Sequence, residues 1–255
     1  MIGSVQKALK ILIAISDGKN TPVSLADLSV KTGINKSTCS HIVSTLAKEG
    51  FVKRISHTQG YVLGPEAYCL SRFGKYDNEF VSLCRPVIDW LYKQTNCAII
   101  LAVTQAGKKF TIDHIDTPIK TLTNSYEIMP DDIYRTATGR IIMANMNSDE
   151  IKEVFDKNGL PPEKHWDEIT SLDALKNELS KINKRGVLKT VHFNSDTCNI
   201  GYAAAIYKHT RCVGAIGIAL QTTKSELHNL LKKEQSLTKH LLAARTEIGR
   251  RLRYS

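Results

Sequence analysis

The chain has 255 residues, of which 42% are hydrophobic and 24% charged, so it is long enough for one large domain or two ordinary ones. No run of about 18 apolar residues is present, which argues against a membrane-spanning helix, and no internal repeat or low-complexity tract is found. The net charge of +10 is compatible with a polyanionic partner, but alone it does not distinguish nucleic acid from a membrane surface or from simple solubility. Residues 1–65 hold eight Lys or Arg against three acids, so charge density is highest there.

The six cysteines show no CxxC pairing and lie mostly in apolar runs, which is typical of reduced, buried thiols. The apolar N-terminal stretch is interrupted by Lys7 and Lys10 and lacks a small-residue cleavage site, so no signal peptide is expected. Both observations predict a cytoplasmic protein.

The first 65 residues carry the signals of a winged helix-turn-helix. A first helix is predicted over 4–16, a second over 24–33, and a third after the cap residue Asn35. Two short strands, 51–55 and 61–63, flank a polar turn and predict a hairpin. The order helix, helix, turn, helix, hairpin is that of a winged helix. On the first helix we expect one apolar face formed by Val5, Leu9, Leu12 and Ile13.

The third helix has an apolar stripe along one side, so its other side faces solvent or a partner. The stripe is formed by Cys39, Ile42, Val43, Leu46 and Ala47. The opposite side carries short polar groups rather than the usual long charged ones, and its residues are Lys36, Ser37, Thr38, Ser40, His41 and Ser44. Hydroxyl and imidazole groups can reach base edges in a major groove without steric obstruction.

Basic residues on the hairpin add a second potential contact with nucleic acid. Lys53, Arg54 and His57 could hold the flanking phosphates or enter the minor groove. We therefore predict a DNA-binding surface formed by the third helix with Lys53 and Arg54. The alternative is a winged-helix module that binds another protein.

A second domain is predicted over 78–255, joined to the first (1–65) by a linker helix over 66–77. The second domain begins with an amphipathic helix that ends near Asn96. Strand-like runs follow at 98–103, 110–115, 187–193, 202–207 and 213–220, separated by helical segments at 138–146, 149–158, 171–185 and 224–252. This pattern predicts an α+β domain with a largely antiparallel sheet.

Several segments together resemble the IclR family of bacterial transcriptional regulators. In the first domain these are SVQKALKIL (4–12), SLADLSVKTGINKSTCSHIVSTLAKEGFV (24–52) and GYVLG (60–64). Beyond it, RPVIDWLYKQTNCAIILAV (85–103), TATGR (136–140), AAAIY (203–207) and CVGAIGIAL (212–220) are similar to parts of the effector domain. The resemblance implies a GAF-like ligand-sensing domain, dimers or dimers of dimers, and control of operons for small-molecule catabolism.

The resemblance also implies where a small-molecule effector binds, commonly an organic acid held by backbone amides and hydroxyls. The matching positions, with a loop residue over the pocket mouth, are Met129, Thr136, Ala137, Thr138, Gly139, Asp196, Gly201, Gly217 and Ala219. Here glycine and alanine stand at 217 and 219, where the family has serines, and most of its acidic stretch is replaced by 190–195. Either the ligand is more apolar or aromatic than usual, or ligand sensing has been lost.

Other functional classes have weaker support. His192, Cys198, His209 and Cys212 could in principle hold zinc, but their spacing matches no recognised pattern. No cysteine has neighbours that would activate it as a nucleophile, so we expect no catalytic residue, no metal and no cofactor. An enzyme acting on a small substrate through the second domain is the remaining alternative. The favoured hypothesis is a homo-oligomer that reads a pseudo-palindromic operator in double-stranded DNA.

Overall fold

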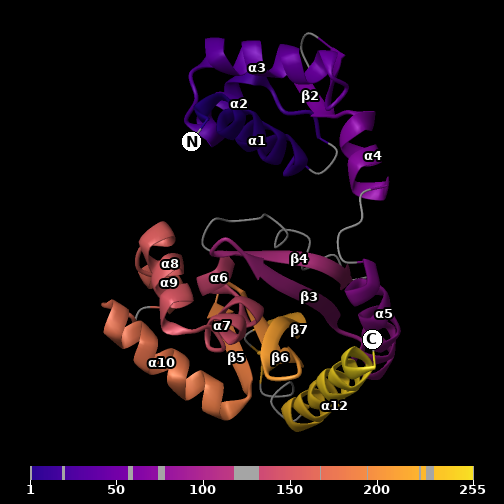
Figure 1. Cartoon of the computed structure of the whole chain (residues 1–255), viewed down its shortest axis with the longest axis vertical. Helices are drawn as coiled ribbons and strands as arrows, with labels where there is room; N and C mark the ends of the chain where they lie inside the picture. The colour runs from indigo at the N-terminus through magenta and orange to yellow at the C-terminus, as the bar shows by residue number, and fades with distance from the viewer. Residues whose placement is uncertain are drawn as a thin grey trace. The chain divides into compact units, whose positions relative to one another are not determined.

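The computed structural model describes residues 2–18, 21–56, 60–73, 78–117, 132–166, 168–193, 195–223, 225–227 and 233–254. The chain divides into two compact units, Met1–Tyr76 and Asp77–Ser255 (Figure 1). The first is a winged helix-turn-helix and the second an α/β domain with an antiparallel sheet, which confirms the predicted fold class. In the described part of the chain, no helix is long and apolar enough to cross a membrane.

The first unit consists of three helices, a hairpin and a further helix. Its elements are α1 (Gly3–Ser16), α2 (Leu25–Thr32), α3 (Lys36–Lys48), β1 (Val52–Ser56), β2 (Gly60–Leu63) and α4 (Pro65–Phe73). The Ser24 hydroxyl accepts a hydrogen bond from the Asp27 amide at the start of α2. Gly33 ends that helix at φ +67°, a backbone conformation that glycine adopts without steric cost. Caps and glycine together produce the tight turn before α3.

Helix α1 contributes residues of its C-terminal half to the core of the first unit. Ile11, Ala14 and Ile15 are buried, whereas Val5, Leu9 and Ile13 are 52%, 54% and 43% exposed. Val5, Leu9 and Ile13, which were predicted to share one apolar face, therefore lie on an exposed side of α1 and not in the core. Apolar residues surround the C-terminal half of α1 on nearly all sides, so helical periodicity cannot select the buried face.

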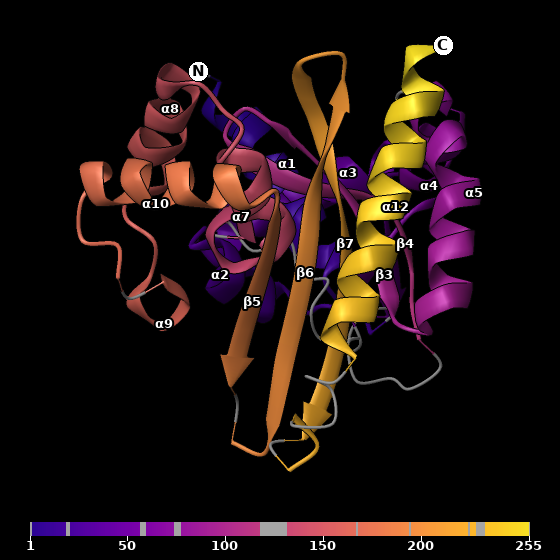
Figure 2. The same cartoon turned by 90° about the horizontal axis from the view of Figure 1, so that it is seen from below.

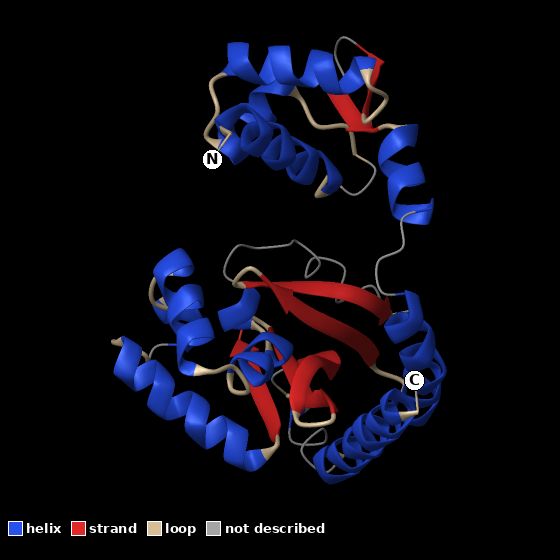
Figure 3. Ribbon diagram, viewed as in Figure 1, coloured by secondary structure: helices blue, strands red, loops and turns tan. Residues whose placement is uncertain are grey.

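The second unit is built on a five-stranded antiparallel sheet in the order β4-β3-β7-β6-β5. Figure 3 draws the strands in red and the helices in blue. The strands are β3 (Ala98–Gln105), β4 (Lys108–Ile115), β5 (Val187–Phe193), β6 (Thr197–Lys208) and β7 (Arg211–Thr223). The helices are α5 (Asn78–Thr95), α6 (Asp132–Arg135), α7 (Ala137–Met143), α8 (Ser148–Asn158), α9 (Glu163–Trp166), α10 (Leu172–Arg185) and α12 (Glu234–Arg253).

Helices cover the two faces of the sheet in separate groups (Figure 2). Side chains of a strand alternate between faces. On β6, Ile200 and Ala204 pack with α5 and α12, whereas Ala203 and Ala205 pack with α7 and α10. The predicted effector residues of β6 and β7 lie on the same face of the sheet as α7 and α10.

Three short or terminal elements differ from the sequence prediction. The four-residue helices α6 and α9 were not predicted, because a single turn carries too little periodicity to be recognised. The predicted helix over 224–252 corresponds to α12, which begins at Glu234. Of these elements, α6 and α9 matter most for function, because both contribute residues to a cavity described below.

Candidate functional site

The outer face of α3 carries the residues predicted to contact DNA. Lys36, Ser37, Ser40, His41 and Ser44 are exposed, and Thr38 is half-buried. The amide of Thr38 donates a 2.8 Å hydrogen bond to the side chain of Asn35, which caps the helix. A single helix face therefore presents three serine hydroxyls, an imidazole and an ammonium group to its surroundings.

The inner face of α3 is held firmly in the core of the first unit. Cys39 and Val43 are fully buried, and the Cys39 thiol donates to the Ile34 carbonyl at 3.5 Å. Ile42 and Leu46 pack against this core, but Ala47 is exposed, so its predicted place in the apolar stripe is wrong. This packing fixes the rotation of α3 about its axis and hence which residues point outward.

The hairpin places two further cations on the surface of the same unit. Lys53 pairs with Val62 and Arg54 with Tyr61 across the antiparallel hairpin. Both basic side chains are exposed, and the Arg54 guanidinium lies 5.7 Å from the centre of the Tyr61 ring. A bridge between Val23 and Tyr61 ties the hairpin to the segment before α2. His57 lies outside the described residues.

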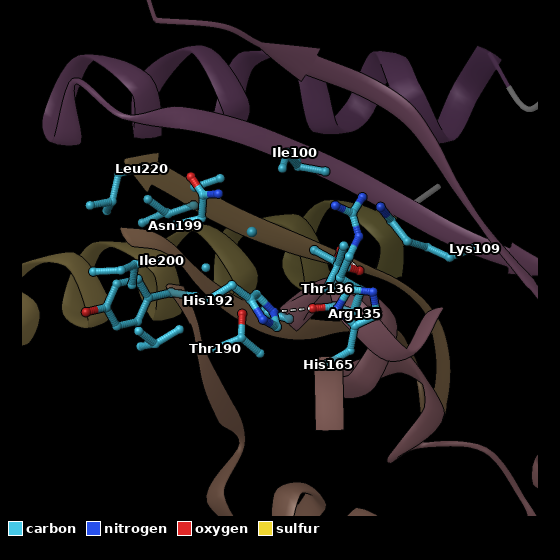
Figure 4. A pocket seen from close by; sticks show the side chains of 18 of the residues that line it. Ile100, Lys109, Arg135, Thr136, His165, Thr190, His192, Asn199, Ile200 and Leu220 are labelled. Atoms are coloured by element: carbon cyan, nitrogen blue, oxygen red, sulfur yellow. Dashed lines mark hydrogen bonds between the residues drawn. The ribbon is translucent and has the colours of Figure 1, made fainter. Parts of the chain in front are cut away.

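A cavity of about 700 Å³ opens on the α7 face of the sheet in the second unit (Figure 4). Its lining comes from five strands and three short helices, which lie far apart in the sequence. Six of the predicted effector residues line it, namely Thr136, Ala137, Thr138, Gly201, Gly217 and Ala219.

Small residues in the strands let α7 lie close to the sheet. A Cβ atom at Gly217 would lie 2.7 Å from Cγ2 of Thr138, and one at Gly201 would lie 3.0 Å from Oγ1 of Thr190. The Thr136 hydroxyl caps α7 by accepting a 3.1 Å hydrogen bond from the Gly139 amide. The threonines at the start of α7 thus serve the helix cap as well as the cavity wall.

Three other predicted effector residues do not line the described cavity. Gly139 packs against the backbone of Ile133, where an added Cβ would lie 2.4 Å from the carbonyl oxygen. Asp196 is exposed in the turn between β5 and β6, beyond the strand positions that face the cavity. Met129 lies outside the described residues.

Basic and polar residues that were not assigned to the effector site also line the cavity. They are Lys109 on β4, Arg135 on α6, His165 on α9, His192 on β5 and Asn199 on β6. Lys109 lies one residue before the predicted strand 110–115, and a lysine at such a position usually indicates a solvent-facing side chain, so the sequence carried no signal for it. No signal marked Arg135 or His165, because each belongs to a helix of one turn.

His192 links β5 to α6 at the cavity wall. Its Nε2 lies 2.7 Å from the Arg135 carbonyl oxygen, which can only accept, so the neutral ring carries its proton on Nε2 (Figure 4). Burial lowers the pKa of the imidazole below its ordinary value, and the charges of Arg140 and Arg135 lower it further. The His165 ring meets that of His192 edge-on at 5.9 Å. His192 is therefore neutral at physiological pH.

Arg140 holds the two short helices in place from the second turn of α7. Its Nε donates to the Tyr134 carbonyl at 2.5 Å, and its Nη2 donates to the His165 carbonyl. The guanidinium also stacks over the Trp166 ring at 4.1 Å. Only 8% of Arg140 is exposed, so its charge is buried and needs these contacts to offset the loss of water. The same contacts hold α6 and α9 in their orientation.

The residues considered for a metal do not converge. Cys198 packs in the core against α5 and α12, whereas His192 lines the cavity on the opposite face of the sheet. Across the described ranges, no group of three or more His, Cys, Asp or Glu side chains is placed to hold a metal ion.

Comparison with known families decides the class of the protein. The family described as "IclR helix-turn-helix domain" matches residues 4–56, and "Bacterial transcriptional regulator IclR C-terminal" matches residues 77–250. The chain belongs to the IclR family. Members of this family are transcriptional regulators and not enzymes, so the alternative of an enzyme acting through the second domain was wrong.

Individual relatives are distant but extend over most of the chain. The "Acetate operon repressor" of Salmonella typhimurium is 20% identical over 190 residues, covering 72% of this chain and 68% of the relative. An IclR-type regulator from Alicyclobacillus acidocaldarius is 17% identical, with a TM-score of 0.74 and 99% of both chains covered. An IclR homolog from Microbacterium hydrocarbonoxydans, solved with 4-hydroxybenzoate, is 15% identical, with a TM-score of 0.72, and 99% of this chain and all of that one are covered.

Proposed function

We propose that this chain reads a specific operator in double-stranded DNA through α3, with Lys53 and Arg54 on the hairpin contacting phosphates. The observation that carries the proposal is the outer face of α3, where Ser37, His41 and Ser44 are exposed on a helix fixed by its core. Such a face suits base edges, and the cations beside it suit the backbone. A DNA-binding protein of this kind works in the cytoplasm.

The operator is a pseudo-palindrome read by at least two copies of the chain. The outer face of α1 supports this part of the proposal, since Ile2, Val5, Leu9 and Ile13 form an exposed apolar row. A row of this kind is covered when two copies associate. Two-fold symmetry in the protein is then mirrored in the DNA site. The two units are joined by the proposed linker 66–77, and α4 (Pro65–Phe73) forms its first part.

The effector binds in the cavity beneath α7 and changes the affinity for DNA. A volume of about 700 Å³ lies within the usual range of small-molecule sites, which supports retained rather than lost ligand sensing. The small residues 201, 217 and 219 leave room for a flat apolar or aromatic body. The Microbacterium homolog bound to 4-hydroxybenzoate supports the same ligand class here. Binding of the effector shifts the population between two arrangements of the DNA-binding units.

Selection of duplexes from a random pool by the full-length protein tests the proposal. We expect enrichment of one sequence with two inverted half-sites separated by about one helical turn or a multiple of it. Failure to enrich any sequence would contradict DNA reading. If the protein instead retains a protein partner in pull-downs and shows no salt-dependent duplex binding, the winged helix is a protein-interaction module.

A further inference from the structure

Two cationic side chains from separate elements meet at one end of the cavity. Lys109 extends from β4 and Arg135 from α6, and both line the cavity wall. Figure 4 shows the ammonium group of Lys109 and the guanidinium of Arg135 directed toward the same end, on the side opposite Asn199. The β4 strand and the α6 helix thus bring together charges that are 26 positions apart in the sequence.

The electrostatics of this end favour an anion. Lys109 is only 7% exposed, so its charge acts in a medium of low effective dielectric and is weakly screened. Two like charges directed at one point raise the local positive potential, which attracts a negatively charged group. Among the described lining residues, Glu163 is the single acid. The Nε2 proton of His192 is already donated to the Arg135 carbonyl, so it is not offered to the anion.

The small and apolar positions of the cavity lining suit the uncharged part of a ligand. Its floor is made by Gly201, Gly217 and Ala219, and Ile100 and Leu220 add apolar walls. None of these side chains can donate a hydrogen bond to a carboxylate. These small and apolar positions of β6 and β7 therefore offer a carboxylate no side-chain donor, whereas the basic edge supplies two charged ones.

We propose that Lys109 and Arg135 bind the carboxylate of the effector, while its apolar body lies on the small residues of β6 and β7. The inference rests on the proposed function, because it concerns the ligand of the same cavity. It assigns specificity to two residues outside the set implied by the family resemblance. The ligand class is a small monocarboxylate with an apolar or aromatic body.

Matched acids and amides test the role of the negative charge. The probes are benzoate with benzamide, 4-hydroxybenzoate with 4-hydroxybenzamide, and hexanoate with hexanamide, measured by calorimetry and thermal shift on the full-length protein. We expect at least one acid to bind at least about tenfold more tightly than its amide, as for a charge-assisted hydrogen bond. If no acid binds better than its amide, the inference is overturned.

Variants of the two cations test the assignment of residues. Lys109→Met and Arg135→Gln are each expected to lower the affinity for the acid by about tenfold or more and to remove the preference for the acid over the amide. Lys109→Arg keeps the positive charge and is expected to retain most of this affinity and preference. Lys108→Met is the matched control, because Lys108 is the exposed neighbour on β4 and lies outside the cavity lining. If Lys109→Met fails to fold, as judged by circular dichroism, Lys109→Gln replaces it.

A cavity-filling variant separates failure of this inference from failure of the proposed function. Ala219→Leu places a larger side chain on the cavity floor and is expected to abolish acid binding. If Ala219→Leu abolishes binding while Lys109→Met and Arg135→Gln keep the preference for the acid, the effector site stands and the inference is wrong. If Ala219→Leu leaves acid binding unchanged, the ligand binds elsewhere, and both the proposed effector site and the inference about Lys109 and Arg135 are wrong. Affinity for the selected duplex without ligand stays unchanged in the Lys108→Met control, which lies outside the cavity lining.

Discussion

The α3 surface and the effector cavity both offer cations and hydroxyl groups, but in different surroundings. The six α3 residues lie within nine positions of the sequence, 36–44, and are largely exposed to water. The cavity is assembled from five strands and three short helices, and its Lys109 is 7% exposed. Charges on α3 and the hairpin are therefore screened by salt, whereas those of the cavity are sheltered and depend on the packing of their unit.

The largest expected difference between the two sites is their response to salt. Raising NaCl from 50 to 200 mM should lower duplex affinity by roughly a hundredfold or more, because phosphate contacts release counterions. Affinity for the best carboxylate probe should change by less than about threefold, because Lys109 is buried and Arg135 is half-buried. Fluorescence anisotropy and calorimetry measure the two affinities.

The hairpin cations provide the control for the salt experiment. Replacing Lys53 and Arg54 by Ala should reduce the slope of log affinity against log salt by about one unit for each residue. The same change at the exposed Lys93 of α5 should leave the slope unaltered. A duplex affinity that does not depend on salt would contradict the proposed phosphate contacts.

Loss of sequence discrimination is the next largest effect. The double variant Ser37→Ala/His41→Ala should reduce the ratio of operator to random-duplex affinity by about a hundredfold, since each base contact contributes about 1–3 kcal/mol. Anisotropy with the selected operator and a scrambled duplex measures this ratio. The matched control, Ser180→Ala/His114→Ala, changes exposed residues of the second unit. An unchanged ratio in the α3 variant would show that this face does not read bases.

Arg140 tests how strongly the cavity depends on packing. Arg140→Met should destabilise the second unit by about 3 kcal/mol, because two carbonyls lose hydrogen bonds from a charged donor. Acid binding should weaken with it, since α6 and α9 lose their shared anchor. Urea unfolding measures the loss, and Arg185→Met, an exposed arginine on α10, should change stability by less than about 0.5 kcal/mol. Equal stability of the two variants would contradict the anchoring role.

The smallest expected effect is a pH dependence from His192. Burial lowers the pKa of its imidazole, so the folded state favours the neutral ring. The stability contribution is complete above the ordinary pKa of about 6.5 and is lost as pH falls toward the lower pKa of the folded state. His192→Gln keeps a donor for the Arg135 carbonyl and should flatten this part of the profile. Urea midpoints at pH 7.5 and 5.5 test it, and identical pH profiles for both proteins would contradict it.

Much of the architecture was predictable because its signals are local. The capped turn before α3, the hairpin and the alternating strands each lie within a short segment, and the fold class and family expected from them are confirmed. The buried face of α1 could not be predicted because an almost uniformly apolar helix segment has no unique periodicity. The DNA-binding residues remain a prediction, supported by their exposure.

The cavity was only partly predictable because its residues meet through tertiary structure. Thr136, Gly201 and Gly217 could be located by resemblance to known segments. A lysine on a strand, such as Lys109, usually indicates a solvent-facing position, and Arg135 lies in a helix too short to be recognised. Only the antiparallel order of the sheet and the packing of α6 against it bring these two residues to one place.

The most direct test of an effector-controlled regulator is the coupling between the two sites. Anisotropy of the selected operator is measured with and without a carboxylate that saturates the cavity. We predict that at least one such acid changes operator affinity by about fivefold or more, that the operator changes acid affinity by the same factor, and that Ala219→Leu removes both effects. An acid that saturates the cavity and leaves operator affinity unchanged would contradict the account.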